Sequence, residues 1–383
     1  MAEFICRVCG SEALDVVPEY AALPRVTSDC KPWPAGGTMT ACLNCGAAQK
    51  RPDAAWFNEI KRIYDGYQIY KLSGGSEQVI FDASGSATPR SRALVDFVVT
   101  EAKPASSGAL IDIGCGNGAA LVNFSRALPS WSMHGSELSD APLDTLRALP
   151  NFGGFYKDEP RNLKGRFDIV TMIHALEHMP DPLHTLIDSA ALLNPGGRLF
   201  VDIPNVETSI FDLVIADHMM HFSSAHLGYL AQRAGLKAEV LRDDILPKEI
   251  TMLAGKGSGT APLPDAKRGL ALVRRHVAWL RRVLDDAHEA MENASSFGIF
   301  GTSISGMWLY GAMREQVAFF VDEDRTRIGN MFDGKPIVAP QDAPVGSTIF
   351  LPLNPDSAVN VHKRLQSRID ARLVQPCVMD RAA

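Results

Sequence analysis

The stretch that decides the fold is Leu110-Ile-Asp-Ile-Gly-Cys-Gly-Asn-Gly118. An apolar run ends in Asp112, and glycines at positions 114, 116 and 118 then let the backbone turn sharply and approach a ligand before a helix begins. The glycines fall at every second position, whereas a dinucleotide-binding dehydrogenase usually has Gly-x-Gly-x-x-Gly. The spacing disfavours a dehydrogenase, which is the structural alternative for this pattern.

Four apolar runs around this loop predict the strands of one sheet. They are Ala109–Ile113, Trp131–Gly135, Phe167–Met172 and Gly197–Ile203, and helical patterns separate them. Strands that alternate with helices predict a parallel, doubly wound α/β sheet, here from about residue 89 to about residue 253.

Carboxylates after the next two strands extend the pattern. Glu137 lies 25 residues after Asp112, where a carboxylate can accept hydrogen bonds from both hydroxyls of a ribose. Asp158 follows a third apolar stretch, at the height expected for an adenine amino group. Together with the glycine loop, these positions predict a nucleoside-binding edge of the sheet.

Length, composition and charge limit the number of domains and the kinds of partner to expect. The chain has 383 residues, is 46% hydrophobic and carries a net charge of −6, so we expect two to three globular domains. An acidic chain has no overall field that attracts nucleic acid. The longest uncharged window, Ala294–Met313, contains four glycines and four serines and predicts a strand, a turn and a helix start instead of a membrane span. Because charged residues interrupt any apolar segment at the N-terminus, we expect a cytoplasmic protein.

Four of the seven cysteines form two pairs, Cys6-x2-Cys9 and Cys42-x2-Cys45, each followed by glycine. Two such turns supply the four thiolates of a closed tetrahedral zinc site, which leaves no open position for catalysis. The sequence therefore predicts a structural zinc module, and the alternative is two unrelated pairs of buried cysteines. We expect Cys30 to be an ordinary cysteine and not a ligand.

The glycine loop and its carboxylates resemble those of the class I S-adenosylmethionine-dependent methyltransferases, in which Asp-x-Gly-x-Gly-x-Gly wraps the methionine end of the cofactor. The resemblance implies a Rossmann-like core with S-adenosylmethionine bound by Asp112, Gly114, Cys115, Gly116, Glu137, Asp158 and His174. The string Leu176-Glu177-His178-Met-Pro180-Asp-Pro182 is common in these enzymes after the fourth strand. We expect it to close the cofactor pocket, with a catalytic role as the alternative.

A four-cysteine zinc module, a class I methyltransferase core and a C-terminal α/β domain follow one another along the chain. This order resembles that of the sugar C-methyltransferases, which act on nucleotide-linked keto-sugars. The resemblance spans almost the whole chain and includes Gly301-Thr-Ser-Ile-Ser-Gly306 and Gly334-Lys-Pro-Ile-Val338 in the last domain. The family's Glu-His-x-x-Tyr-Phe string matches Asp217-His218-Met219-Met220-His221-Phe222, so aspartate replaces glutamate and histidine replaces tyrosine. The family also carries a tyrosine ahead of a serine-rich loop, for which Tyr70 is the first choice and Tyr67 the second.

Methylation of carbon requires removal of a proton next to a ketone, which leaves an enolate. The resemblance implies that His218 removes this proton, that Asp217 orients or supports it, and that Tyr70 or His221 stabilises the enolate oxygen. From its residue type alone, His218 is equally well a structural histidine.

Other functions are open at this stage. O-methylation needs only a base near a hydroxyl group, and N-methylation or an inactive relative are further alternatives. An RNA methyltransferase or a zinc-dependent nucleic-acid adaptor needs a basic zinc module, but residues 1–50 carry four basic and five acidic side chains.

We expect three parts: a zinc-binding module over residues 1–60, a methyltransferase domain over residues 61–255, and residues 256–383 as a helix plus a second Rossmann-like α/β domain. In the last part, Gly301-x-Ser303-x-x-Gly306 followed by Asp322 is a partial dinucleotide pattern. It predicts a site for the substrate's nucleotide, a packing domain without a ligand, or a second NAD site. We expect a monomer or a small homo-oligomer that acts on a small molecule, with no nucleic-acid or membrane partner.

Overall fold

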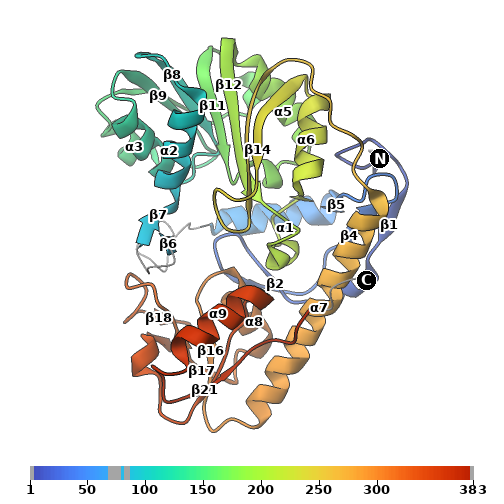
Figure 1. Ribbon diagram of the computed structural model, residues 1–383, viewed down its shortest axis with the longest axis vertical. Helices are drawn as coiled ribbons and strands as arrows, with labels where there is room; N and C mark the ends of the chain where they lie inside the picture. Colours follow the sequence, from blue (N-terminus) through green and yellow to red (C-terminus); the bar gives the residue numbers. More distant parts are fainter. Residues whose placement is uncertain (1–3, 68–78, 82–86, 380–383) are drawn as a thin grey trace.

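The computed structural model describes residues 4–67, 79–81 and 87–379. Its central sheet has seven strands in the order β10-β9-β8-β11-β12-β15-β14 (Figure 1). These strands are β8 (Gly108–Ile113), β9 (Trp131–Ser136), β10 (Phe152–Tyr156), β11 (Phe167–Ile173), β12 (Leu193–Pro204), β14 (Leu236–Arg242) and β15 (Glu249–Lys256). The α/β fold class predicted from the sequence is confirmed.

One strand departs from the predicted parallel sheet. The first five strands run parallel, but β15 is antiparallel to both of its neighbours, β12 and β14. Residues 243–248 join β14 to β15, and this connection is too short for the crossover that parallel strands require. The chain therefore reverses in a hairpin at this edge of the sheet.

Helices cover both faces of the central sheet (Figure 1). They are α2 (Arg90–Ala102), α3 (Ala119–Ala127), α4 (Leu143–Arg147), α5 (Pro182–Ala191) and α6 (Ser224–Arg233). Along β8 the side chains alternate between the faces: Leu110 joins the core under α2 and α3, whereas Ile111 and Ile113 join the core under α5 and α6. Burial on both faces explains the continuous apolar run of β8.

The N-terminal part is a small sheet with irregular loops. Its elements are β1 (Leu14–Val16), the 3-10 helix η1 (Pro18–Ala22), β2 (Arg25–Val26), β3 (Pro32–Trp33), β4 (Met39–Cys42), β5 (Ala48–Lys50) and α1 (Ala54–Asp65), and the hairpin β6 (Val79–Phe81) and β7 (Ala87–Pro89) follows. The sheet order is β1-β4-β5-β13, in which β13 (Met220–His221) comes from the segment after β12. The N-terminal sheet is therefore completed by a strand that carries one of the predicted site histidines.

The C-terminal part begins with the long helix α7 (Ala266–Glu292), as predicted. A sheet of order β18-β19-β17-β16-β20-β21 follows, parallel except for β18. Its elements are β16 (Phe297–Phe300), α8 (Ile304–Met313), β17 (Val317–Val321), β18 (Met331–Phe332), β19 (Lys335–Val338), the 3-10 helix η6 (Pro340–Asp342), β20 (Thr348–Phe350), α9 (Pro355–Leu365) and β21 (Arg372–Val374). The second α/β domain expected from the sequence is present.

All three parts share one buried cluster. Tyr20 of the N-terminal part, Leu213 of the segment after β12, and Trp308 of α8 all lie in it. The indole N–H of Trp308 also donates to the Pro24 carbonyl at 2.7 Å. The segment after β12, residues 205–223, is thus packed between the N-terminal and C-terminal parts, and this packing sets the position of the site described below. Among the described residues, no helix is both long enough and apolar enough to cross a membrane.

Candidate active site

The glycine loop turns tightly at the carboxyl end of β8. Gly114 and Gly116 have φ of +71° and +57°, in the left-handed region that favours glycine. A Cβ atom on Gly114 would lie 2.8 Å from the Ala175 side chain, so the loop has no room for a larger residue there. The N–H groups of Gly114 and Cys115 donate to the Ser136 carbonyl at 2.8 and 3.0 Å, which ties the loop to the end of β9.

Glu137 presents a carboxylate directly at this loop. Its Oε2 accepts the Gly116 N–H at 3.0 Å, and its Oε1 accepts the Leu138 N–H at 2.7 Å. Asp158 lies exposed beyond the neighbouring strand, and its carbonyl accepts the Ser136 hydroxyl at 2.8 Å. The predicted cofactor residues of the loop and of the second and third strands therefore lie along one edge of the sheet.

Two other predicted cofactor residues lie inside the protein. Asp112 is 2% exposed and accepts the Thr171 hydroxyl at 2.6 Å, which joins β8 to β11. Burial raises the pKa of Asp112 to about 7. Cys115 is also buried, and burial raises the pKa of its thiol. Both side chains are thus buried at the base of the glycine loop.

His174 ends β11 in a cluster of charged groups. It has a φ of +50°, and its Nε2 lies 3.4 Å from a Glu249 carboxylate oxygen and 3.8 Å from an Asp202 oxygen. Arg90 pairs with both carboxylates, at 2.8 Å to Asp202 and 2.9 Å to Glu249. Burial lowers the pKa of His174, so the neutral imidazole is favoured.

The segment after β12 builds a buried pair of histidines on one carboxylate. The 3-10 helix η5 (Ile210–Val214) carries Asp212, whose Oδ1 is 2.6 Å from Nδ1 of His218 and whose Oδ2 is 2.6 Å from Nδ1 of His221. Burial opposes the charge on Asp212, but the two histidines outweigh it and hold its pKa well below the usual range. Burial lowers the pKa of both histidines.

This arrangement fixes the tautomer of each ring. A carboxylate that accepts from Nδ1 keeps the proton on that nitrogen and leaves a lone pair on Nε2. A neutral histidine held in this way can act as a general base. Asp212 is thus the carboxylate that orients His218.

Asp217, the carboxylate expected to orient or support His218, acts on this ring through its charge, which favours a higher pKa, whereas the hydrogen bond to the ring comes from Asp212. Asp217 instead accepts hydrogen bonds from Ser28, through the backbone N–H at 2.9 Å and the hydroxyl group at 2.5 Å. Its carboxylate also lies 3.5 Å from Nδ1 of His178. The seven residues from Asp212 to His218 fold back through η5, which places the more distant aspartate against the ring.

His178 belongs to the same group of side chains, although its string was expected mainly to close the cofactor pocket. Its ring packs edge-on against His218 with centroids 4.6 Å apart, and its Nδ1 is 3.3 Å from the Tyr64 hydroxyl. Burial and the neighbouring His218 lower the pKa of His178 to about 4. Tyr67 contacts the Ser28 hydroxyl at 3.2 Å, whereas Tyr70 lies outside the described residues.

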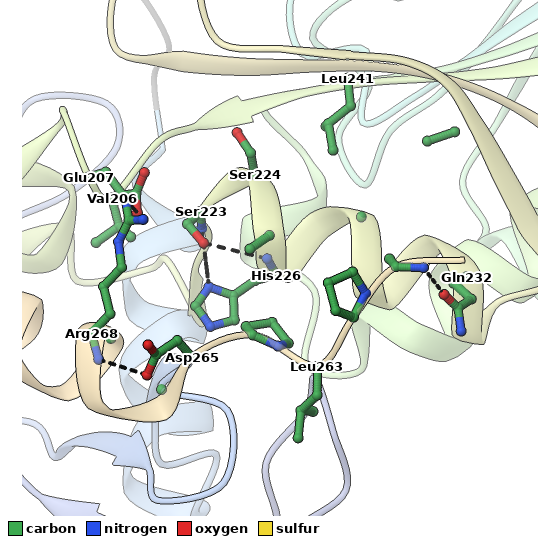
Figure 2. A pocket seen from close by; sticks show the side chains of 18 of the residues that line it. Val206, Glu207, Ser223, Ser224, His226, Gln232, Leu241, Leu263, Asp265 and Arg268 are labelled. Carbon is green, nitrogen blue, oxygen red and sulfur yellow. Dashed lines mark hydrogen bonds and ion pairs between the residues drawn. The ribbon is translucent and has the colours of Figure 1, made fainter. Parts of the chain in front are cut away.

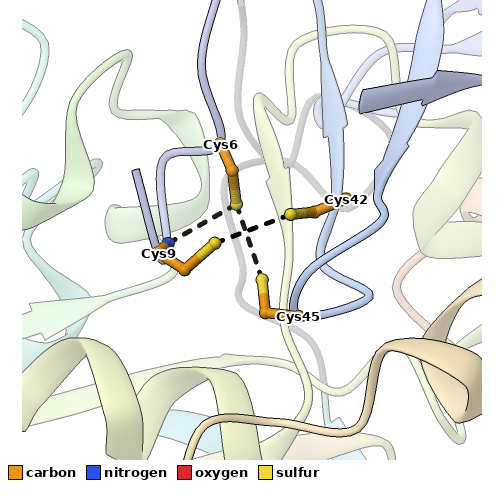
Figure 3. A group of neighbouring side chains, drawn as sticks. All are labelled: Cys6, Cys9, Cys42 and Cys45. Atoms are coloured by element: carbon orange, nitrogen blue, oxygen red, sulfur yellow. Dashed lines mark hydrogen bonds between the residues drawn. The ribbon is translucent and has the colours of Figure 1, made fainter. Parts of the chain in front are cut away.

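The four paired cysteines converge on one point, as Figure 3 shows. Sγ of Cys6 is 3.5 Å from Sγ of Cys45, and Sγ of Cys9 is 3.6 Å from Sγ of Cys42. Tetrahedral zinc with Zn–S bonds of about 2.3 Å places its sulfurs about 3.8 Å apart. The donor set and its spacing fit a closed zinc site, and Cys30 is not part of the group.

Three other groups of possible metal ligands lie among the described residues. One of them, Glu177, His178 and His218, contains a buried carboxylate whose two oxygens have no hydrogen-bond partner. In the other two groups the carboxylates already have partners. In the cluster of His174, Asp202 and Glu249, the guanidinium group of Arg90 pairs with both carboxylates. Around Asp212, both carboxylate oxygens accept imidazole hydrogen bonds. Neither cluster offers a set of free donor atoms.

A cavity of about 830 Å³ lies between α6, the loop before α7 and the start of α7 (Figure 2). His221 borders it, and Nε2 of His221 is buried without a hydrogen-bond partner. None of the predicted cofactor residues lines this cavity, and His218 does not line it either. The two histidines on Asp212 therefore have different surroundings: His218 packs against His178, and His221 borders the separate cavity.

In the C-terminal part, the side chains of the partial dinucleotide pattern form hydrogen bonds and an ion pair within the protein. Asp322 accepts both the N–H and the hydroxyl group of Thr302, at 3.0 and 2.6 Å. Arg327 is 8% exposed, donates to the Thr302 hydroxyl at 3.1 Å and pairs with Asp322 at 3.7 Å. The carboxylate that could meet a ribose is engaged within the protein.

Residues 87–240 match a sequence family described as a methyltransferase domain. The chain contains a methyltransferase domain. This domain carries the glycine loop, Glu137 and the histidine pair, and the match supports a class I methyltransferase core.

The curated relatives match about a third of the chain. The ubiquinone biosynthesis O-methyltransferase of Vibrio parahaemolyticus is 27% identical over 136 residues, which are 33% of this chain and 57% of that protein. The protein of the same name from Marinobacter nauticus is 29% identical over 124 residues, 29% of this chain and 51% of that protein. The chain thus spans little more than half the length of these relatives.

Solved structures match at lower identity. An S-adenosylmethionine-dependent methyltransferase from Clostridium acetobutylicum has a TM-score of 0.39 and 13% identity, over 53% of this chain and 99% of that chain. An O-methyltransferase from neocarzinostatin biosynthesis, in complex with S-adenosylmethionine, has a TM-score of 0.35 and 20% identity, over 39% of this chain and 49% of that chain.

Proposed function

We propose that this protein is an S-adenosylmethionine-dependent methyltransferase that methylates a carbon atom of a nucleotide-linked keto-sugar. The observation that carries the proposal is the Asp212 carboxylate, which holds Nδ1 of His218 at 2.6 Å. A buried, neutral and oriented histidine is what removal of a proton next to a ketone requires.

The residues at the glycine loop fit S-adenosylmethionine. The left-handed backbone at Gly114 and Gly116 brings main-chain atoms close to a ligand, and no pyrophosphate needs to be accommodated there. Glu137 accepts the Gly116 N–H with the carboxylate that is predicted to bind the ribose hydroxyls. In the proposal Asp158 would bind the adenine, and His174 would help to bind the methionine end.

Bound S-adenosylmethionine supplies an electrophilic methyl group on a sulfonium sulfur. Nε2 of His218 takes a proton from the acceptor carbon next to the ketone, and the C–H electron pair moves to form an enolate. The proton stays on the imidazolium, whose charge the Asp212 carboxylate stabilises through Nδ1. The carbon of the enolate is the nucleophile for the methyl group.

Three further residues have supporting roles in the proposal. Tyr70 donates a hydrogen bond to the enolate oxygen. His221, the other residue expected for this role, gives its Nδ1–H to Asp212 and keeps only a lone pair on Nε2. Asp217, locked by Ser28, orients His178 next to His218. His178 then forms one wall of the acceptor site.

A second candidate function is O-methylation of a sugar or another small metabolite. The names of the curated relatives, ubiquinone biosynthesis O-methyltransferases, favour it. The same His218–Asp212 pair would then take the proton of a hydroxyl group. RNA methylation is a remote third candidate, because the N-terminal fifty residues are slightly acidic.

The proposal extends to the whole chain. Residues 1–60 form a module that the four cysteines hold around structural zinc, residues 61–255 form the methyltransferase domain, and residues 256–383 form a helix plus a second Rossmann-like α/β domain. We propose a monomer or small homo-oligomer in the cytoplasm that works on a small molecule.

Methyl transfer to a panel of acceptors tests the proposal. The zinc-loaded protein is incubated with S-adenosylmethionine carrying a ¹³C-methyl group and with nucleotide-linked keto-sugars, the matching reduced sugars and catechol-type metabolites. Mass spectrometry should show one labelled methyl group on a keto-sugar, and two-dimensional NMR should place it on carbon. Label on oxygen supports the second candidate, and absence of label on every acceptor contradicts both.

A further inference from the structure

A lysine of the N-terminal part is completely buried next to the histidine pair. Lys50 ends β5 and has 0% of its surface exposed. A lysine is almost never fully buried unless its ammonium group has partners, since removal of the charge from water is costly. Burial lowers the pKa of Lys50 to about 7, and the neighbouring Arg25 acts in the same direction.

The partners of this ammonium group belong to the segment that carries His218. Nζ of Lys50 donates to the carbonyls of Ile215 and His218, the second at 3.1 Å. The Lys50 backbone N–H donates to the Met219 carbonyl at 2.9 Å. One residue of β5 therefore binds three carbonyls within five consecutive positions of the segment after β12.

The same strand is tied to the cysteine site. Gln49 accepts the Arg7 N–H at 2.8 Å and donates to the Ile5 carbonyl at 3.0 Å, on either side of Cys6. On the other edge of β5, Ala48 pairs with His221 and Gln49 pairs with Met220. The strand thus connects the cysteine cluster to both histidines that bind Asp212.

We propose that Lys50 is a positioning residue of the active site, through which the cysteine module holds the backbone of residues 215–218 and aligns His218 with Asp212. This inference rests on the role of His218 under the proposed function. The lysine acts only through the backbone of the segment, and it does not touch the reacting atoms.

His221 does not depend on the Lys50 side chain in the same way. Its backbone is held by strand pairing with Ala48, and its Nδ1 binds the opposite oxygen of Asp212. The hydrogen bonds of the Lys50 ammonium group go to Ile215 and His218, although its charge also lowers the pKa of His221. Loss of the ammonium group is therefore expected to displace His218 and to change His221 only electrostatically. A general weakening of the fold would affect both histidines together.

Proton NMR of the full-length, zinc-loaded protein with ¹⁵N-labelled histidine tests the inference without any methyl acceptor. Imidazole Nδ1–H groups that donate to a carboxylate give resonances far downfield of ordinary ring protons. We expect two such resonances from the pair on Asp212, and His218→Gln and His221→Gln assign them.

In Lys50→Met the His218 resonance should disappear, whereas the His221 resonance should remain visible. The affinity for S-adenosylhomocysteine should stay within about twofold of wild type. Lys50→Gln keeps an uncharged NH₂ donor and should shift the His218 resonance more than the His221 resonance, and this variant serves if the methionine variant does not fold. The matched control is Lys256→Met, because Nζ of Lys256 also donates to a backbone carbonyl, that of Leu193, at 3.0 Å. It should leave both resonances in place.

A His218 resonance at the wild-type position in either folded Lys50 variant overturns the proposal, and so does loss of both resonances from a folded variant. Because this readout needs no methyl transfer, failure to find an acceptor affects the proposed function alone. With an acceptor in hand, Lys50→Met should lower kcat about tenfold or more, since misplacement of a base by about 1 Å is costly, and it should leave the KM for S-adenosylmethionine unchanged.

Discussion

Replacement of Asp212 by asparagine is the sharpest single perturbation of the proposed site. The carboxylate accepts from His218 and His221 at 2.6 Å each, and it is 1% exposed. Asparagine has nearly the same shape, but it offers one acceptor oxygen and an NH₂ group that donates. One histidine keeps its Nδ1–H bond, whereas the other meets a donor and must move its proton to Nε2.

The magnitude follows from these two bonds. Hydrogen bonds to a charged group are worth about 1.5–3 kcal/mol each, and the variant weakens one and inverts the other. Relief from burying a charge offsets part of this loss, so we expect a net destabilisation of about 2–4 kcal/mol. If the ring that changes tautomer is His218, its Nε2 cannot accept a proton, and the rate of methyl transfer should fall about 10³–10⁴-fold, as happens when a catalytic histidine is held in the wrong tautomer.

Urea unfolding measures the stability, and ¹⁵N chemical shifts of labelled histidine report the tautomers directly. The matched control is Asp181→Asn, because Asp181 binds Nδ1 of the exposed His184 at 2.9 Å and asparagine preserves its role at the start of α5. The control should change the free energy of unfolding by no more than about 0.5 kcal/mol, and it should leave the tautomers of His218 and His221 unchanged. Unchanged tautomers and wild-type methyl transfer in Asp212→Asn would refute the assignment of this pair as the base.

Further predictions concern the cofactor, the metal and pH. Glu137→Ala should weaken binding of S-adenosylhomocysteine about 10–100-fold in calorimetry, because a charge-assisted hydrogen bond to the ribose is lost; equal affinity contradicts the assigned role. Elemental analysis should find one zinc ion per chain, and Cys42→Ser should lower both the zinc content and the melting temperature, whereas Cys30→Ser should leave the zinc content unchanged. Gly114→Ala should destabilise the protein by about 1–3 kcal/mol in urea unfolding, because alanine is strained at φ +71° and its Cβ meets Ala175. Stability should fall as the pH is lowered from about 6.5 to about 4, because the unfolded chain binds a proton at His178 in this range and the folded chain does not. The urea concentration at the unfolding midpoint should therefore fall across this range, and it should fall less in His178→Gln.

The central sheet could be predicted because its local signals agree with one another. The apolar run of β8, the alternate glycines and the acidic residue after β9 are each set by near-neighbour geometry, and the structure brings Gly116 and Glu137 to 3.0 Å as that pattern requires. The reversed strand β15 was not predicted, because its apolar residues fit a parallel strand equally well. Its direction depends on the length of the preceding turn.

Of the group formed by Asp212, His218 and His221, the sequence analysis predicted the two histidines but not the aspartate. His218 and His221 were identified from their string, but the carboxylate that orients them was assigned to the adjacent Asp217. A 3-10 helix brings Asp212 under the rings instead, and no hydrophobic periodicity marks such a short turn. The contacts of Ser28 and Lys50 join residues more than 150 positions apart, so only the tertiary fold brings them to the site.

The most direct measurement of the central claim is exchange of an acceptor C–H for deuterium in D₂O, with S-adenosylhomocysteine bound in place of the methyl donor. Mass spectrometry follows deuterium uptake next to the ketone of a nucleotide-linked sugar. We expect uptake with the wild-type protein and none above background with His218→Ala, while calorimetry shows that both bind S-adenosylhomocysteine equally. Uptake at the wild-type rate in His218→Ala, or no uptake by the wild-type protein with a keto-sugar that it methylates on carbon, would contradict His218 as the base.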